Sequence, residues 1–318
     1  MHENEKNDLL KHTGIYNYKE KNIQKLVEGT LQIRPSSFYR YRACNDYNFD
    51  ALVHDYVWMS HPREYNDPDD SRIYYDALEA FSPALNTLIN QWISGDVKKF
   101  VKYLIGKKEF PIFNGPAPSQ LKKAAQNKKR KEYDETDHKI DFFTNKFREL
   151  SEMHLSQLEG TLNNQFFICS FSTKVDNRLM WSHYSDSHKG FCIEYATSSV
   201  YTPGGLVLPV CYLSEPIDIT NQIKHSFPNG LGVGSSVIGS AMVKNDDWRY
   251  EDEWRLVLLD ATDRKQVIEK PSAIYLGVNI SDDNKEKALS ICEEKEIPAF
   301  QMLQSKGGFG VSVGKQLA

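Results

Sequence analysis

The stretch of residues 166–195, FFICSFSTKVDNRLMWSHYSDSHKGFCIEY, constrains the fold more than any other part of the chain. Its first part alternates apolar residues with two serines, and this period of two predicts a strand. Residues 191–195 follow a glycine and predict a second strand. Between the strands we expect a short helix, because Asp176 or Asn177 can cap a first turn that leads into apolar residues. A compact strand–helix–strand unit is therefore the predicted centre of the fold.

This unit carries more polar and aromatic side chains than a packed core requires. Two serines share one face of the first strand, and the helix adds two aromatic rings and an imidazole; the residues are Ser170, Ser172, Trp181, His183 and Tyr184. Hydroxyl groups can bind a polar ligand, and aromatic side chains can wall a planar ring. We therefore treat the unit as a candidate binding site.

The rest of the chain mixes strand and helix patterns and predicts a single α+β domain. Residues 71–160 are predicted to be a largely helical insert, basic between Lys122 and Lys131, and residues 1–15 are predicted to be mobile. Further strands are expected over 37–42, 55–60, 206–212, 251–259, 273–278 and 299–303, the last followed by a glycine-rich tail. Helices are expected over 19–28, ended by Gly29, over 45–53 and 237–243, and over 281–295, capped by Ser281. The glycine-rich run over 229–236 lacks the spacing of a phosphate-binding loop, so we interpret it as a flexible loop.

Composition excludes several classes of protein. The chain has 318 residues, 40% of them apolar, and a net charge of -4, which argues against a protein whose main role is to coat nucleic acid. No apolar run approaches the ~20 residues that span a bilayer. The five cysteines are widely spaced, which indicates neither a disulfide framework nor a zinc site; they are Cys44, Cys169, Cys192, Cys211 and Cys292. A cytoplasmic protein is the expectation.

Two glutamates stand at the start of a predicted strand. Glu251 and Glu253 are two residues apart, so on an extended chain both carboxylates point to one side, about 6.5–7 Å apart. Such a pair can bind sugar hydroxyls or stabilise a developing cation, and mutual repulsion raises at least one pKa. A solvated strand start is the plainer alternative, since acidic residues are ordinary there.

Two arginines share one face of the strand predicted over 37–42. Arg40 and Arg42 can form salt bridges at the rim of a sheet, which is a purely structural role. A guanidinium is also the natural partner of a phosphate group. Beside the hydroxyls and rings of the 166–195 unit, the two arginines suit a dinucleotide.

An acidic turn offers a different chemistry. Asp67, Asp69 and Asp70 can hold a divalent ion together with the two glutamates, as in a nuclease or another phosphoryl-transfer enzyme. The run NDPDD lacks the spacing of an EF-hand loop, however, and is typical of a turn. We predict no metal site and keep the metal-dependent enzyme as an alternative.

Several segments resemble a bacterial family known only as the domain of unknown function twenty-nine seventy-one. They are FYRYR, VWMSHPREYNDPDD, FFICSFS, LMWSHYSDSHKGFCIEY and WRYEDEWRLV. The likeness spans about residues 37–280 and is interrupted by the helical insert. That resemblance implies no established activity.

The order of three motifs also resembles ADP-ribosyltransferases of the arginine–serine–glutamate type. Those enzymes carry an arginine on an early strand, a Ser-x-Ser strand followed by a helix and a strand, and a Glu-x-Glu motif. Arg40 or Arg42, the serines at 170 and 172, and Glu251 with Glu253 match that order. The middle motif departs from the usual Ser-Thr-Ser, and the sequence leaves open which arginine corresponds.

This resemblance implies an α+β fold with a split mixed or antiparallel sheet that holds NAD in a cleft. It implies that Arg40 or Arg42 binds the pyrophosphate and that the serines line the nicotinamide ribose. Glu253 would bind the ribose and stabilise the oxocarbenium-like state, while Glu251 orients the acceptor.

Beyond the site, the acceptor is unknown and is a protein, a nucleic acid or a small molecule. The sequence leaves open whether such an enzyme works as a toxin, a phage-defence effector or a housekeeping modifier. We expect the basic insert to select an acceptor or a partner protein. A non-catalytic nucleotide-sensing module is the remaining alternative.

Overall fold

A computed structural model describes residues 3–16, 21–80, 166–226, 238–259 and 263–318, together with Ala261 and a few single residues between 145 and 160. Most of the predicted insert, including the basic run over 122–131, lies outside these residues, as does the glycine-rich run over 229–236. No helix in the described ranges combines the length and the apolar character needed to cross a bilayer. The fold is α+β, as predicted.

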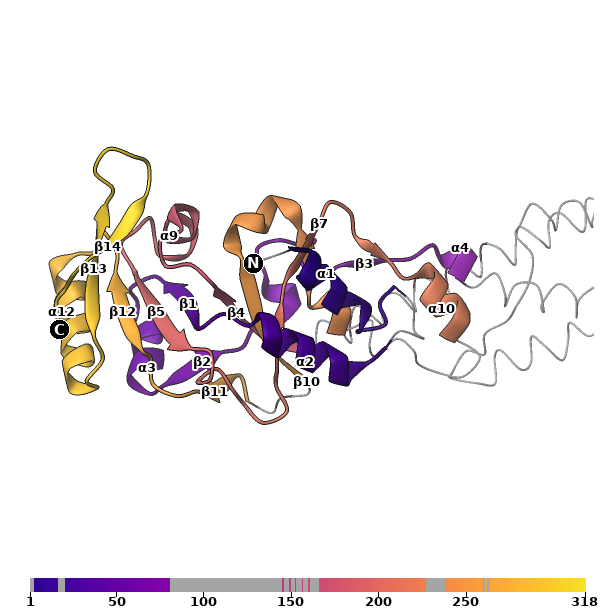
Figure 1. Ribbon diagram of the computed structural model, residues 1–318, viewed down its shortest axis with the longest axis horizontal. Helices are drawn as coiled ribbons and strands as arrows, with labels where there is room; N and C mark the ends of the chain where they lie inside the picture. Colours follow the sequence, from indigo (N-terminus) through magenta and orange to yellow (C-terminus); the bar gives the residue numbers. More distant parts are fainter. Residues whose placement is uncertain are drawn as a thin grey trace, which may run out of the picture.

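An eight-stranded mixed sheet with the strand order β14-β13-β12-β5-β1-β4-β10-β6 runs through the molecule (Figure 1). Only β12 and β13 are parallel within it. β1 (Ser37–Arg42) pairs with β5 (Phe191–Ala196) along its whole length, and β4 (Phe166–Ser172) pairs in the same way with β10 (Glu253–Leu259). β1 and β4, however, share a single register pair, Tyr39 with Ser172. The sheet therefore consists of two halves that diverge from this pair.

The β1 half is closed by the C-terminal part of the chain. β12 (Ala273–Leu276) joins β5, and β13 (Ala299–Gln304) and β14 (Val311–Gln316) form the edge. The sequence predicts only a glycine-rich tail after 303, so β14 is a correction: the tail turns through glycines and returns as an antiparallel strand.

Helices cover both faces of this half. α3 (Asp46–Val53) and α12 (Asp282–Glu294) pack apolar side chains such as Phe49, Leu52 and Ile291 against one face. α9 (Arg178–Tyr184) packs Met180 and Trp181 against the other, and Figure 1 shows α9 and α3 on opposite sides of β1 and β5. Asn177 caps α9 and Ser281 caps α12, as the sequence predicts.

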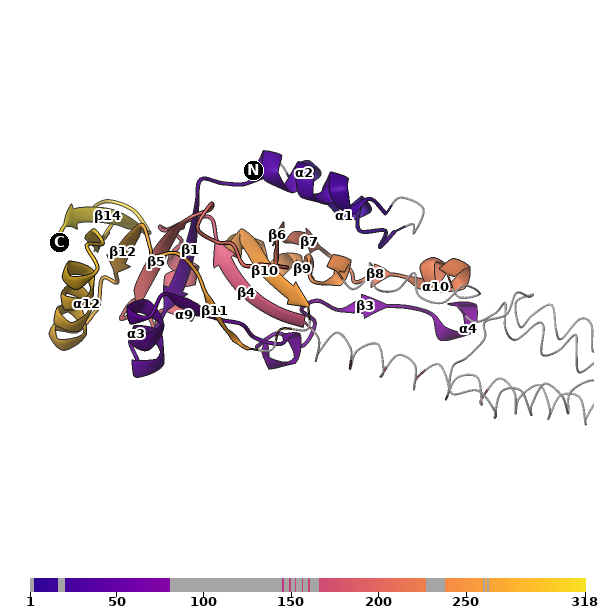
Figure 2. The same ribbon diagram turned by 90° about the horizontal axis from the view of Figure 1, so that it is seen from below.

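The β4 half is covered by the N-terminal helices. α1 (Glu3–Lys11) and α2 (Ile23–Ile33) lie over β6 (Leu206–Pro209) and β10 (Figure 2). Residues 1–15 were expected to be mobile, but Leu9 and Leu10 of α1 are buried in the core. Gly29 was expected to end a helix over 19–28; it lies inside α2 instead, where any Cβ would collide with Leu9. This glycine lets the two helices pack closely.

Short elements surround the open end of the sheet. The strand predicted over 206–212 is broken at Val210, because β6 pairs with β10 whereas β7 (Cys211–Leu213) pairs with β9 (Val243–Asn245). Of the helix predicted over 237–243, only residues 238–240 are described as helical.

The helical insert predicted from residue 71 begins differently: its described start holds β3 (Ile73–Tyr74), paired with β8 (Ile217–Asp218), and α4 (Ala77–Ala80), which lies against α10 (Thr220–Ser226). The remaining elements are β2 (Tyr56–Trp58), paired with β11 (Lys265–Val267), and the 3-10 helices η2 (Pro62–Glu64) and η4 (Asp246–Glu251).

Candidate functional site

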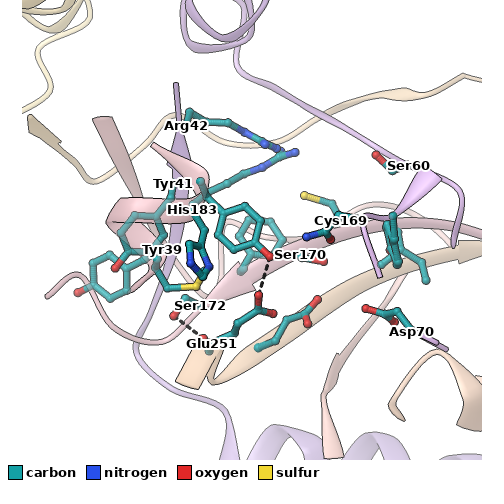
Figure 3. A pocket seen from close by; sticks show the side chains of 18 of the residues that line it. Tyr39, Tyr41, Arg42, Ser60, Asp70, Cys169, Ser170, Ser172, His183 and Glu251 are labelled. Atoms are coloured by element: carbon teal, nitrogen blue, oxygen red, sulfur yellow. Dashed lines mark hydrogen bonds between the residues drawn. The ribbon is translucent and has the colours of Figure 1, made fainter. Parts of the chain in front are cut away.

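A pocket of about 490 Å³ opens where β1 and β4 diverge. One side is lined by the end of β1, with Arg40 and Arg42, and the other by β4 and the start of β10. α9 contributes His183 and Tyr184, and the segment after β2 contributes Asp70. Figure 3 shows Arg42 on one side of this space, with Glu251 and Asp70 opposite. Residues from five separate stretches of the chain therefore meet in one place.

Glu251 and Glu253 reach the pocket through a turn, not along an extended strand. Glu251 ends η4, Asp252 adopts the left-handed conformation with φ 44 and ψ 56, and Glu253 begins β10. The expectation of two carboxylates on one side of an extended chain is therefore wrong in its geometry. Both carboxylates nevertheless converge, because they bind the same ammonium group.

Lys244 on β9 supplies that ammonium group. Its Nζ lies 2.6 Å from Oε2 of Glu251, 3.1 Å from Oε2 of Glu253 and 3.4 Å from Oδ2 of Asp70. The ring of Trp248 lies 5.0 Å from the same Nζ. Lys244 is buried, so it joins three carboxylates within a largely desolvated cluster.

Arg255 binds two of these carboxylates, Glu253 and Asp70. Its Nε donates to Glu253 Oε1 at 2.8 Å, and its Nη2 donates to both oxygens of Asp70 at 2.8 Å. Its Nη1 donates to Ser71 Oγ and to the carbonyl of Ala241. Every nitrogen of this fully buried guanidinium has a partner, which is the condition under which a buried charge is tolerated.

The pKa values of the two glutamates are shifted in opposite directions. Burial raises the pKa of Glu251 above its ordinary value, and the adjacent charge of Glu253 raises it further. Burial alone would also raise the pKa of Glu253, but Arg255 and Lys244 outweigh burial and hold it well below the ordinary value. The cluster contains three carboxylates and two cations, so one negative charge is in excess when all five groups are ionised.

Tyr184 contacts the glutamate with the raised pKa. Its hydroxyl donates to Glu251 Oε1 at 2.6 Å. Burial and the charge of Glu251 raise the pKa of Tyr184, so the phenol stays protonated and remains a donor. His183, also predicted as a site residue, lines the pocket and places its Nδ1 3.0 Å from the hydroxyl of Tyr250.

Arg40 has few partners for a buried cation. Its side chain is 7% exposed, and its Nη2 donates to the carbonyl of Trp58 at 3.1 Å. Its Nε has no hydrogen-bond partner, and no described carboxylate lies within ion-pair distance of the guanidinium. Arg42 is half-buried on the same face of β1. The β1 side of the pocket thus presents positive charge that the described residues leave uncompensated.

The two predicted serines occupy different environments. Ser172 is fully buried, and its hydroxyl donates to the backbone carbonyl of Glu251 at 2.7 Å, so it fastens β4 to the end of η4. Ser170 is partly exposed to the pocket, and its hydroxyl contributes to the low pKa of Glu253. Cys169 also lines the pocket, where burial raises the pKa of its thiol to about 11.

Trp181 does not line the pocket, contrary to expectation. Its ring is fully buried beneath α9, and the indole N–H donates to the carbonyl of Val175 at 2.7 Å. It packs edge-on against Tyr41 at 5.2 Å between ring centroids. The aromatic pattern of this helix therefore reflects a packed core at 181 and a pocket wall at 184.

The residues of the acidic turn separate from one another. Asp70 joins the Lys244 cluster, whereas Asp67 accepts from the backbone N–H of Asp69 and Asp69 pairs with Arg72 at the surface. Within the described ranges, no group of three acidic, histidine or cysteine side chains is arranged as a metal site. The ammonium of Lys244 stands between the three pocket carboxylates, where a cation shared by them would lie.

Sequence reasoning missed two members of the cluster, Lys244 and Arg255. It grouped Asp70 with the glutamates only as a possible metal ligand, not as a partner of buried cations. A usable signal exists for Arg255, because Glu253 and Arg255 are two apart on one strand and must share a face. Lys244 gives no such signal, since its approach depends on β9 pairing with β7.

Comparison of the chain with protein-family models, with curated proteins and with solved structures finds no match. The two resemblances carried by its motifs therefore stay predictions.

Proposed function

We propose that the pocket binds NAD and that the protein is an ADP-ribosyltransferase-like enzyme. The observation that carries the proposal is the meeting of three sequence motifs around one pocket. Arg40 and Arg42 stand across it from Glu251 and Glu253, with the Ser-x-Ser strand between them. The pocket volume of about 490 Å³ falls within the ~300–1,000 Å³ of ordinary ligand sites.

The β1 side suits the pyrophosphate. A buried guanidinium without a carboxylate partner gains most from a ligand that brings negative charge and oxygen acceptors. Arg40 lines the pocket and has a buried Nε without a partner among the described residues, and Arg42 follows it two residues later on the same face. A pyrophosphate bound here satisfies both arginines and leaves the remainder of the ligand facing the glutamates.

The β10 side suits the reacting ribose. A pair of titratable groups whose pKa values are pushed apart divides the chemical roles between them. Glu253 stays ionised and supplies negative charge next to the oxocarbenium-like state that develops as the bond to nicotinamide breaks. Glu251, with its raised pKa, accepts the proton of the acceptor nucleophile as the new bond to ribose forms.

The proposal is tested by thermal stabilisation with NAD, ADP-ribose and ATP, followed by mass spectrometry of the NAD. We expect NAD to stabilise the protein and to be converted to nicotinamide and an ADP-ribosyl product. Glu251→Gln should keep NAD binding and lower turnover by about 100- to 1000-fold, since it removes one charge-handling group. Asp246→Asn, at the exposed start of the same 3-10 helix, is the matched control.

Two results would reject this proposal. Stabilisation by NAD without its consumption would make the protein a nucleotide-sensing module. Nuclease activity that a chelator abolishes, with indifference to NAD, would favour the metal-dependent alternative.

A further inference from the structure

The turn between the two glutamates has an unusual backbone. Asp252 has φ 44, in the left-handed region that residues other than glycine rarely adopt. This conformation lets η4 end at Glu251 and β10 begin at Glu253 with both carboxylates directed at Lys244. Contacts that fix the backbone of Asp252 therefore also fix the positions of the two glutamate carboxylates.

A lysine of the N-terminal helix contacts Asp252 directly. Lys6 of α1 is 3% exposed, and its Nζ lies 3.0 Å from Oδ1 of Asp252. Oδ2 of Asp252 accepts from the hydroxyl of Thr173, just after β4. Burial would raise the pKa of Asp252, but Lys6 and Thr173 outweigh it and lower that pKa. Asp252 is therefore a carboxylate tied to α1 on one side and to β4 on the other.

Lys6 has a second route to the same turn. Its ammonium lies 5.8 Å from the ring centre of Tyr212, and the hydroxyl of Tyr212 accepts from the backbone N–H of Glu253 at 2.8 Å. The backbone carbonyl of Lys6 in turn accepts from the thiol of Cys211. α1 is thus fixed to β7, and β7 is fixed to the first residue of β10.

We infer that Lys6 is a positioning residue for the carboxylate pair: by binding Asp252 it holds the left-handed turn that brings Glu251 and Glu253 together. Lys6 does not line the pocket, so it acts through Asp252 and touches no ligand. The apolar side of α1 is already anchored by Leu9 and Leu10, so docking of the helix alone does not require a buried lysine. The burial of Lys6 is instead explained by its ion pair with Asp252.

The geometric half of the inference holds for any chemistry at the site, while its catalytic half rests on the proposed function. The first readout is therefore independent of activity. The protein is labelled with ¹³C in the glutamate carboxyl groups, and the Glu251 resonance is identified as the one absent from Glu251→Gln. Its titration reports whether Glu251 remains beside Glu253 in the buried cluster.

Lys6→Met keeps the length of the side chain and removes its charge. We expect the pKa of Glu251 to fall towards its ordinary value, because the turn relaxes and the carboxylate moves towards water. Lys6→Arg should retain the native titration. Lys11→Met, which removes an exposed lysine from the same helix, should also leave it unchanged.

The decisive comparison adds a second substitution to Lys6→Met. Glycine adopts the left-handed conformation without strain, whereas alanine does not. Adding Asp252→Gly should restore the native pKa of Glu251, and adding Asp252→Ala should not. This pair decides the question even if Lys6→Met alone folds poorly. Equal titrations of the Gly and Ala double variants, or a native titration in a folded Lys6→Met, would overturn the inference.

The same variants test the catalytic half. A small misplacement of reacting groups costs about 100-fold in rate, so Lys6→Met should lower kcat on that order while KM for NAD stays nearly constant. The Asp252→Gly double variant should recover the rate. If the protein does not consume NAD, the proposed function fails, but the titrations still decide whether Lys6 positions the pair. If NAD is consumed and kcat does not change in Lys6→Met, the catalytic half is wrong.

Discussion

Each side of the split sheet buries an arginine, and the two arginines are treated differently. Arg255 on β10 is fully buried, and each of its nitrogens is bound by carboxylates, a hydroxyl or a carbonyl. Arg40 on β1 is 7% exposed, yet among the described residues it binds one carbonyl and its Nε has no partner. Arg255 is thus a fully hydrogen-bonded structural cation, whereas Arg40 keeps a donor that no described residue uses.

The comparison predicts opposite consequences for stability and for binding. Removing one partner of a buried ion pair leaves the other charge desolvated, which is strongly destabilising. Removing a buried charge that has no ionic partner relieves a desolvation cost instead. The β10 side should therefore be needed for the fold, and the β1 side for the ligand.

The largest expected effect is that of Arg255→Met. It leaves Asp70 and Glu253 buried with Lys244 as their shared cation, and we expect a loss of about 3–5 kcal/mol of unfolding free energy. Denaturant unfolding followed by circular dichroism measures it. Arg249→Met, at a half-exposed ion pair with Asp246, should cost less than about 1 kcal/mol. Similar losses in both variants would contradict the comparison.

Arg40→Met should do the reverse. The loss of its hydrogen bond to Trp58 costs about 1 kcal/mol, but removing the desolvated charge offsets part of that cost, so the net loss of stability should stay below about 1 kcal/mol. Binding of NAD or ADP-ribose should weaken about 10- to 100-fold, because a hydrogen bond between charged groups contributes about 1.5–3 kcal/mol. Isothermal calorimetry measures the affinity. A large loss of stability with native affinity would give Arg40 a structural role.

The pH dependence of stability sharpens the comparison within the β10 side. The folded pKa of Glu251 is raised, so this group binds more protons in the folded state than in the unfolded state. Its contribution therefore favours folding at low pH and is lost as the pH rises from the ordinary glutamate value through the raised one. The unfolding free energy of the native protein minus that of Glu251→Gln should fall over this window. A group with a lowered pKa, such as Glu253, makes the opposite contribution, because it stabilises the fold more as the pH rises. A difference in unfolding free energy that rises with pH would therefore contradict the raised pKa of Glu251.

Tyr184→Phe gives the smallest effect. It removes the hydroxyl that donates to Glu251 Oε1 while the ring remains, and we expect a loss of about 1 kcal/mol. The pKa of Glu251 should also rise further, since the phenol stabilises its ionised form. Titration of the Glu251 carboxyl resonance measures the shift. A fall in that pKa would show that the phenol does not serve the ionised form.

Elements set by local signals were predictable from the sequence. β1, β4, β5 and α12 match the expected ranges closely, because alternation and caps are encoded within each segment. The prediction that Gly29 ends a helix was wrong, because the sequence does not distinguish a glycine at a helix end from one that allows a neighbouring helix to pack closely. The break at Val210 and the strand β14 depend on partners elsewhere in the chain.

The sequence predicted many of the residues that line the pocket, but not the contacts that they make with one another. Glu251, Glu253, Arg40, Arg42, Ser170, His183 and Tyr184 all line the pocket. The left-handed turn at Asp252 and the arrival of Lys244 were not predictable, because both depend on tertiary pairing. The prediction that Trp181 lines the pocket was wrong, because a pattern of aromatic residues on a helix does not show which ring faces the core.

The single register pair between β1 and β4 has a consequence for assembly. The β1 half and the β4 half are joined by few backbone hydrogen bonds, so each half resembles a separate unit. The chain nevertheless alternates between the halves: it runs from β1 to β4, back to β5, then to β6 and β10, and finally to β12. No cut in the chain releases one half intact. Both halves must form before the pocket exists, and with mostly long-range strand pairing such a chain is expected to fold slowly. Ligand binding at this pocket would therefore report completion of the whole fold.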